Sequence, residues 1–265
     1  MDFSLVLDEE GIAHELRSTG EDRWALMVDE ADLARAQAAL TAFERENPLP
    51  IPRVQAPRPP TPAVACGLVL FLSILAFHVW TGPESPASLW FSRGGADAAA
   101  IVRGEWWRTV TALTLHADAG HAAGNAVLGG LLLGLLAHAL GPGVAAILVV
   151  LAGSAGTFAA AELLRRDFIS VGASTAVFGA LGVLAALRQH RRRAWVPLGA
   201  GLALLAFLGT SKRADLAGHL CGFACGLLLG AGVSPLPPLR GRVAQAALAL
   251  IAAAAPVAAW LAAFR

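Results

Sequence analysis

The sequence predicts an all-α polytopic membrane protein, with seven spanning helices, preceded by a small soluble α+β domain. Of the 265 residues, 56% are hydrophobic and only 15% are charged, and the mean hydropathy is +0.61. Soluble domains are less apolar and more highly charged than this. The formal net charge of +1 gives no reason to expect nucleic acid as a partner.

Residues 1–46 differ in composition from the rest of the chain. They carry charges throughout, their apolar runs are short, and apolar residues recur at helical spacing after Asp29. The run at residues 3–7 is too short to distinguish a strand from a helix. The chain begins without the basic and apolar pattern of a signal peptide. We therefore expect a small soluble α+β domain, followed by a proline-rich linker at residues 47–62.

Seven apolar segments in the remaining chain are candidate membrane spans, because a spanning helix needs ~20 mostly apolar residues. They lie at 63–81, 119–139, 143–163, 172–188, 194–210, 215–234 and 243–262. We assign 63–234 to a membrane core and 235–265 to an additional helix with the C-terminus. Residues 82–118 contain charges and two aromatic pairs, a composition typical of a structured loop partly embedded in the membrane.

Arginines near the ends of the spans predict the orientation of the protein. The densest cluster, RQHRRR at residues 188–193, lies on the same side of the membrane as the N-terminus if seven spans are present. Because basic residues concentrate in cytoplasmic loops, we expect the N-terminus to be cytoplasmic.

Polar residues within the spans concentrate at the starts of three helices. His121 and Asn125 are four residues apart in the second span and project from one face of it. Ser174 lies at the start of the fourth span, and His219 near the start of the sixth. These helix starts share one side of the membrane, opposite the arginine cluster. Polar residues matched in depth on separate helices indicate a functional site.

Small residues surround the serine and the histidine, and they let the two helices approach closely. We therefore expect Ser174 to form a hydrogen bond with His219. The glycines in question are Gly218, Gly222, Gly226 and Gly230 on the sixth span, and Gly172, Gly179 and Gly182 around the serine.

A serine beside a histidine indicates nucleophilic catalysis, because the histidine can take the proton that keeps the hydroxyl a weak nucleophile. The Ser174 backbone N–H, His121 and Asn125 are candidate donors to an oxyanion. No acidic residue obviously completes a triad. Asp215, four residues before His219, is either an orienting group or a helix N-terminal residue favoured by the helix dipole.

Three motifs together resemble the rhomboid intramembrane serine proteases over about residues 63–234. In chain order they are WWRTVTALTLHADAGHAAGN, SVGASTAVFGALG and AGHLCGFACG. The resemblance implies that Ser174 is the nucleophile, that His219 is the general base, and that His121 and Asn125 line the oxyanion hole. Supporting roles are implied for His116, Trp107, Arg108, Phe178, Gly172, Gly222 and Gly226. The seventh span is similar to that of the six-plus-one variant of the family.

The resemblance also implies the substrate class and the location. A rhomboid-like bundle of six helices plus a seventh would sit in a bacterial inner membrane. It would hydrolyse peptide bonds in or near transmembrane segments of single-span or other membrane proteins. The implied dyad chemistry uses no metal and no cofactor.

Two positions depart from the family pattern: Thr175 follows the serine where glycine is common, and Gly218 precedes the base where alanine is common. The first alternative is a catalytically inactive rhomboid-like binder or chaperone. Thr175 would then indicate that the chain has drifted from the catalytic pattern. The second is a small transporter using the same histidines. A transporter predicts polar residues through the whole depth of the bundle, whereas this sequence has them only in the outer half.

Overall fold

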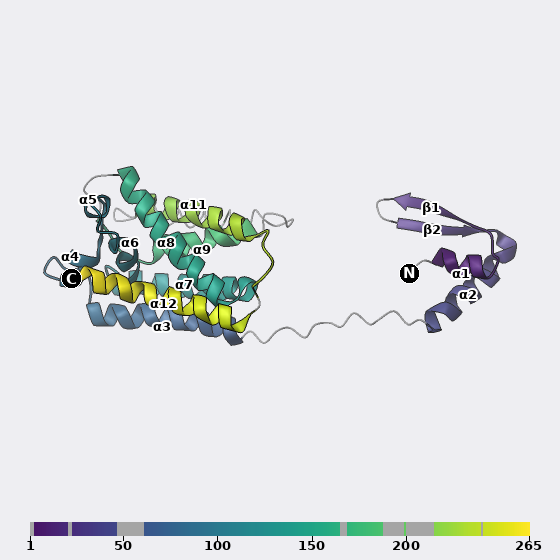
Figure 1. The fold of residues 1–265 in the computed structure, drawn as a ribbon, viewed down its shortest axis with the longest axis horizontal. Coiled ribbons are helices and arrows are strands. Elements are labelled where there is room, and N and C mark those ends of the chain that lie inside the picture. Colours follow the sequence, from purple (N-terminus) through teal and green to yellow (C-terminus); the bar gives the residue numbers. More distant parts are fainter. Residues whose placement is uncertain are drawn as a thin grey trace. The chain divides into compact units, whose positions relative to one another are not determined.

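A computed structural model describes residues 3–20, 23–46, 61–164, 169–187, 199, 215–239 and 241–265. The chain divides into two compact units, Met1–Arg58 and Pro59–Arg265, which we treat separately (Figure 1). The arginine cluster lies outside the described residues, and so does the predicted span at 194–210 apart from residue 199.

The N-terminal unit combines helices with one antiparallel hairpin, which confirms the α+β prediction. Residues 3–7, which the sequence leaves open between strand and helix, are helical, and Leu7 is fully buried in a cluster with Ile12 and Ala36. In the hairpin, Leu16 pairs with Leu26. The elements are α1 (Phe3–Glu9), β1 (His14–Gly20), β2 (Arg23–Val28), the 3-10 helix η1 (Glu30–Asp32) and α2 (Leu33–Glu46).

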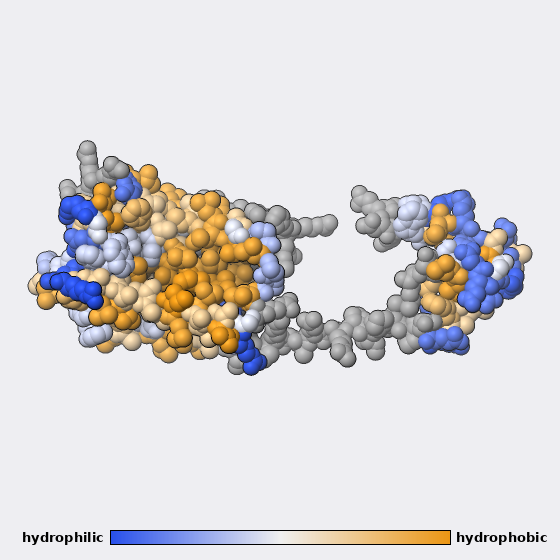
Figure 2. All heavy atoms as spheres, viewed as in Figure 1, coloured by the Kyte–Doolittle hydropathy of each residue, from blue (hydrophilic) through white to orange (hydrophobic). Residues whose placement is uncertain are grey.

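The second unit is a bundle of apolar helices, as the sequence predicts. Among the described residues, five helices are long and apolar enough to cross a membrane, and α9 is a shorter apolar helix. Apolar side chains cover the middle of the bundle, and polar ones gather at its two ends (Figure 2). The protein is therefore a multi-pass membrane protein. The helices are α3 (Thr61–Thr81), α7 (Ala119–Leu140), α8 (Pro142–Leu164), α9 (Ser174–Leu187), α11 (Leu216–Val233) and α12 (Arg242–Ala263).

Helix α9 occupies the centre of the bundle, packed against α7, α8 and α11, and every residue from Thr175 to Ala186 is buried. Its contact with α11 is backbone against backbone. A Cβ atom on Gly226 would lie only 2.0 Å from the Gly179 carbonyl oxygen, and one on Gly222 only 2.2 Å from that of Thr175. Glycine is therefore required on this face of α11.

The loop between α3 and α7 is structured, as its aromatic composition predicts, and gathers at one end of the bundle (Figure 1). A two-residue ladder of β3 with β4 joins it to the segment that precedes α9. The sequence does not predict this ladder, because two residues are too few to show an alternating pattern. The loop elements are α4 (Leu89–Gly94), β3 (Ala96–Asp97), α5 (Ala98–Val102), α6 (Arg108–Thr111) and the 3-10 helix η2 (Ala112–Thr114), and the partner strand is β4 (Ile169–Ser170).

Gln245 fastens the beginning of α12 to the turn between α7 and α8. Its buried side-chain oxygen accepts hydrogen bonds from the backbone N–H groups of Gly143, at 2.7 Å, and Val144, at 3.1 Å. Its amide nitrogen donates to the carbonyl of Leu140 at 2.9 Å. One side chain thus forms hydrogen bonds with a free carbonyl in the last turn of α7 and with free N–H groups in the first turn of α8.

We predict that Gly226→Ala destabilises the bundle, because the added methyl group would overlap the backbone of α9. Overpacking of this kind costs about 1–3 kcal/mol. The matched control is Gly232→Ala on the same helix, where a Cβ atom meets nothing within 4 Å. The midpoint of thermal unfolding in detergent should fall for Gly226→Ala and stay level or rise slightly for Gly232→Ala. Equal unfolding midpoints for the two variants would contradict the close backbone contact between α9 and α11.

Candidate active site

Ser174 and His219 meet where α9 and α11 begin. Ser174 is the first residue of α9, and His219 lies in the first turn of α11. The serine Oγ is 2.8 Å from the histidine Nε2, a hydrogen-bond distance, and the histidine is only 5% exposed. The structure therefore brings together the two residues in which the sequence predicts a nucleophile and a base.

Phe178 holds the plane of the His219 ring. It lies one helical turn after Ser174, is fully buried, and stacks on the imidazole with ring centroids 4.5 Å apart and planes 24° apart. Within the described part of the chain, the buried Nδ1 of His219 has no hydrogen-bond partner. The ring is therefore oriented by stacking and by the serine rather than by a carboxylate.

Asp215 caps α11 and does not bind the His219 ring. Its carboxylate accepts a hydrogen bond from the backbone N–H of Gly218 at 2.6 Å. Burial raises the pKa of this carboxyl, and hydrogen bonds from Gly218 and from the Ser170 side chain act in the opposite direction. A Cβ atom on Gly218 would lie 2.1 Å from the carboxylate, which explains why glycine stands where alanine is common.

His121 and Asn125 lie against the segment that leads into Ser174. Gly172 has φ +128, and a Cβ atom there would lie 2.6 Å from His121 Cε1 and 3.5 Å from Asn125 Nδ2. The Asn125 amide nitrogen is buried and has no partner among the described residues. Since the first N–H groups of a helix have no intrahelical acceptor, the Ser174 N–H also lies at an open position. These donors suit an oxyanion beside the serine.

His116 supports the same segment from the loop. It is completely buried, and its Nε2 accepts a hydrogen bond from the backbone N–H of Ala173 at 3.3 Å. Burial, with a smaller effect of neighbouring His121, lowers the pKa of His116 to about 3. The imidazole is therefore neutral near pH 7 and keeps a lone pair for the bond.

His78 extends this arrangement to a row of three histidine rings. Its ring centroid is 6.5 Å from that of His116, which is 5.3 Å from that of His121. The sequence motifs do not include His78 among the predicted site residues. Its position could have indicated this arrangement, because His78 lies near the end of the first predicted span, at the same depth as the start of the second.

Arg108 and Trp107 support the loop and lie apart from the serine–histidine pair. Arg108 donates to Glu105 at 2.7 Å and to the carbonyls of Gly95, at 2.9 Å, and Ser92, at 3.1 Å. These bonds satisfy backbone carbonyls that would otherwise lack a partner in an irregular segment. Trp107 immediately precedes α6 and packs edge-to-face on Trp106.

Thr175 fits the structure through its methyl group. The residue is buried, and Cβ atoms on Gly156 of α8 and on Gly222 of α11 would each approach its Cγ2 to 3.0 Å. The methyl group thus fills a space where three helices meet. The departure from the family pattern is accommodated by glycines on both neighbouring helices.

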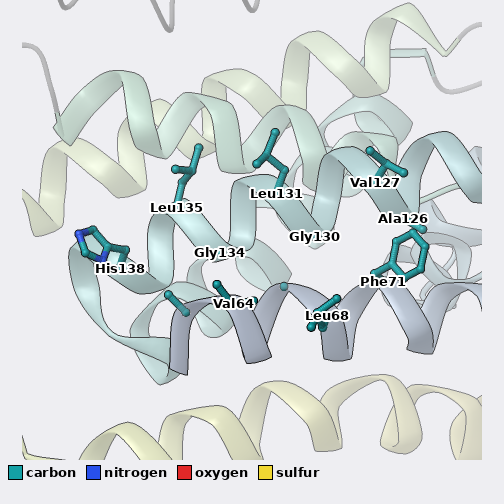
Figure 3. A pocket seen from close by; sticks show the side chains of 12 residues that line it. Val64, Leu68, Phe71, Ala126, Val127, Gly130, Leu131, Gly134, Leu135 and His138 are labelled. Atoms are coloured by element: carbon teal, nitrogen blue, oxygen red, sulfur yellow. The ribbon is translucent and has the colours of Figure 1, made fainter. Parts of the chain in front are cut away.

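A groove of about 500 Å³ lies between α3 and α7, and contains none of the residues described above (Figure 3). Leucine, valine and glycine residues dominate it, including Val64 and Leu131, and His138 stands at one end. Such a surface matches the hydrocarbon of a bilayer and supplies no nucleophile.

Comparison with known proteins places the helical bundle in a family. A rhomboid domain model matches residues 103–236. The chain belongs to the rhomboid family. The match includes both Ser174 and His219, and it ends before α12.

Individual rhomboid relatives include named proteases. The chain is 30% identical over 178 residues to YdcA of Bacillus subtilis (strain 168), a candidate rhomboid protease, covering 61% of this chain and 86% of YdcA. It is 26% identical over 196 residues to rhomboid protease GluP of the same organism, with 71% and 38% covered. It is 32% identical over 155 residues to RHOMBOID-like protein 1 of Arabidopsis thaliana, with 55% and 39% covered. The chain thus spans about two fifths of the latter two proteins.

We predict that His116 makes the fold sensitive to acid. Its folded pKa of about 3 lies below the ordinary 6.5. Between these values the unfolded chain binds a proton that the folded protein does not, so stability is complete above pH 6.5 and falls toward pH 3. The slope is about 1.4 kcal/mol per pH unit.

The measurement is the midpoint of thermal unfolding in detergent from pH 8 to pH 4, compared with that of His116→Gln. The variant keeps an acceptor for Ala173 but has no titrating group. The wild-type midpoint should fall more steeply below pH 6.5 than that of the variant. Parallel curves would show that His116 does not titrate on unfolding.

Proposed function

We propose that this protein is an intramembrane serine endopeptidase whose catalytic dyad is Ser174 and His219. The observation that carries the proposal is the distance of 2.8 Å between the serine Oγ and the histidine Nε2, on two helices that touch through glycines. The two relatives described as rhomboid proteases support the class of reaction.

In the proposed mechanism, Ser174 Oγ attacks the carbonyl carbon of the scissile peptide bond while His219 Nε2 takes the hydroxyl proton. The negative charge that forms on the carbonyl oxygen is stabilised by the Ser174 N–H, His121 and Asn125. His219 then gives the proton to the leaving amine. Water hydrolyses the acyl-enzyme, with His219 again acting as the base.

The proposed substrates are transmembrane segments of single-span or other membrane proteins. The carbonyls of an intact helix are engaged in backbone hydrogen bonds and are shielded by side chains. A substrate helix must therefore unwind locally before Ser174 can reach a carbonyl. Helix-breaking or small residues near the cleaved bond are the expected substrate feature.

We further propose a bacterial inner membrane as the location, with the N-terminus in the cytoplasm. The arginine cluster at 188–193 supports this orientation through the distribution of basic residues. The soluble domain would then comprise residues 1–46, the linker 47–62, the rhomboid core 63–234 and the additional helix 235–265.

The decisive experiment is cleavage of a panel of single-span substrates in proteoliposomes. Ser174→Ala and His219→Ala should each lower cleavage by at least about 10³-fold, and Asn125→Ala by about 10²–10³-fold. Ser154→Ala is the matched control, because Ser154 is another half-buried serine, on α8, whose buried hydroxyl oxygen has no partner among the described residues. Cleavage that persists in Ser174→Ala would refute the dyad.

A second prediction separates a dyad from a triad. Asp215→Asn should retain cleavage, because asparagine also caps helices, whereas Asp215→Ala should lose about 1 kcal/mol of stability. A carboxylate that orients the imidazole would instead make Asp215→Asn lose about 10⁴-fold in rate. The comparison requires turnover per active site and the unfolding midpoint of each variant.

Labelling with a fluorophosphonate distinguishes the protease from a rhomboid-like binder. The active enzyme should be labelled at Ser174, and His219→Ala should abolish the label. A wild-type protein that binds the substrates, cuts none of them and resists the label would establish the binder instead. Cleavage by Thr175→Gly in that case would identify Thr175 as the cause.

A further inference from the structure

Helix α12 lies beyond the residues that the rhomboid model matches, yet it forms a hydrogen bond with the loop that supports the candidate active site. Near the C-terminal end of α12, the indole Nε1 of Trp260 donates to Thr114 Oγ1 at 3.1 Å. The Trp260 ring also packs edge-to-face on Trp90, with centroids 4.9 Å apart. The end of α12 therefore contacts the loop through both a hydrogen bond and an aromatic contact. Figure 1 shows this end of α12 beside α4 of the loop.

The loop is shaped to receive this side chain. A Cβ atom on Gly94 would lie 2.2 Å from Trp260 Cη2, so only glycine leaves room for the indole. The carbonyl of Gly94 accepts a hydrogen bond from the hydroxyl of fully buried Thr111 at 2.7 Å. Thr114 in turn donates to the Thr111 carbonyl at 2.7 Å while its oxygen accepts from Trp260. A hydroxyl can make both bonds at once.

The same loop holds the backbone that leads into Ser174. Two residues before Thr114, the carbonyl of Ala112 accepts a hydrogen bond from Gly172 N–H at 2.9 Å. Two residues after Thr114, His116 Nε2 accepts from Ala173 N–H at 3.3 Å. Both N–H groups immediately before the serine are therefore bound to residues that flank Thr114.

Helix α12 is fixed at both ends, as an element that positions another must be. Gln245 ties its beginning to the turn between α7 and α8. At its other end, Arg93 of α4 donates to the carbonyl of Ala263 at 3.0 Å and lies 5.7 Å over the ring of Phe264.

We propose that Trp260 is a positioning residue for Ser174. Its indole N–H holds Thr114, and the loop residues on either side of Thr114 hold Gly172 and Ala173 at the start of α9. The inference deepens the proposed function and rests on it, because the position of Ser174 matters for its reactivity as a nucleophile. Misplacement of the nucleophile should slow chemistry without weakening substrate binding.

The test compares Trp260→Phe, which removes the N–H and keeps an aromatic ring, with Thr114→Val, and with the double variant. Trp260→Phe should lower kcat per titrated active site by about 3- to 10-fold, the equivalent of one net hydrogen bond, with KM within about twofold. Thr114→Val should lower kcat at least as much, because it also removes the bond to Thr111. The double variant should be no slower than Thr114→Val, because Thr114→Val already removes the only hydrogen bond that Trp260→Phe removes, together with the bond from Thr114 to Thr111. Trp80→Phe is the matched control, since Trp80 belongs to the same aromatic cluster but is 70% exposed.

Hydrogen exchange supplies a measurement that does not depend on catalysis. The amides of residues 172 and 173 should exchange faster in Trp260→Phe than in the wild type and in Trp80→Phe. Unchanged exchange, or additive effects of the two substitutions on kcat, would overturn the proposal. A lower unfolding midpoint with unchanged kcat and unchanged exchange would overturn it too, because Trp260 would then only stabilise the fold.

The two proposals fail in different ways. If the wild type cleaves no substrate and resists the fluorophosphonate, the proposed function fails, while the exchange of residues 172 and 173 still decides whether Trp260 holds this segment. If the wild type cleaves and Trp260→Phe matches it in both kcat and exchange, only the positioning role fails.

Discussion

Backbone contact between α9 and α11 is the constraint on which the candidate active site depends. In a bilayer the hydrophobic effect does not drive helices together, so association relies on close packing of small residues and on hydrogen bonds. Gly222 and Gly226 meet the carbonyls of Thr175 and Gly179, at separations that leave no space for a side chain. Wider spacing of these helices would move Ser174 beyond hydrogen-bond reach of His219.

The cost of polar groups at membrane depth explains the organisation around this contact. In the loop between α3 and α7, the carbonyls of Gly95 and Gly94 accept hydrogen bonds from Arg108 and Thr111, and the ladder with β4 pairs further backbone groups. Six buried side-chain nitrogen or oxygen atoms have no partner in the described ranges, and those of His116, Asn125 and His219 belong to the site around Ser174. Each unpaired group costs about 1–3 kcal/mol. Of these atoms, Asn125 Nδ2 faces the segment that leads into Ser174, where in the proposed reaction it would donate to the charge that forms on the substrate carbonyl oxygen.

The additional helix α12 packs against the rhomboid core and forms hydrogen bonds with it. The family model ends at residue 236, before α12 begins, but α12 packs on α8, α4 and α6 and forms hydrogen bonds at both of its ends. The loop between α3 and α7 consequently lies between two supports: α12 on one side and the segment leading into Ser174 on the other. If Ser174 acts as the proposed nucleophile, it must be held in place within a fluid bilayer, and that requires a rigid loop.

The sequence by itself determined where the five long apolar helices of the described chain lie and that Ser174 and His219 approach one another. Lipid forces a spanning backbone to be helical and sets its length, so apolar runs alone locate helices such as α3 and α7 within a few residues. The spacing of the glycines predicted that Ser174 and His219 meet, because small residues let two membrane helices approach closely. Only the tertiary structure decided that α9 begins at Ser174 rather than at 172, where Gly172 takes a positive φ against His121. It alone decided that Asp215 caps a helix and that Trp260 binds Thr114. These features depend on single contacts, most of them between residues far apart in the chain, so a local sequence pattern cannot predict them.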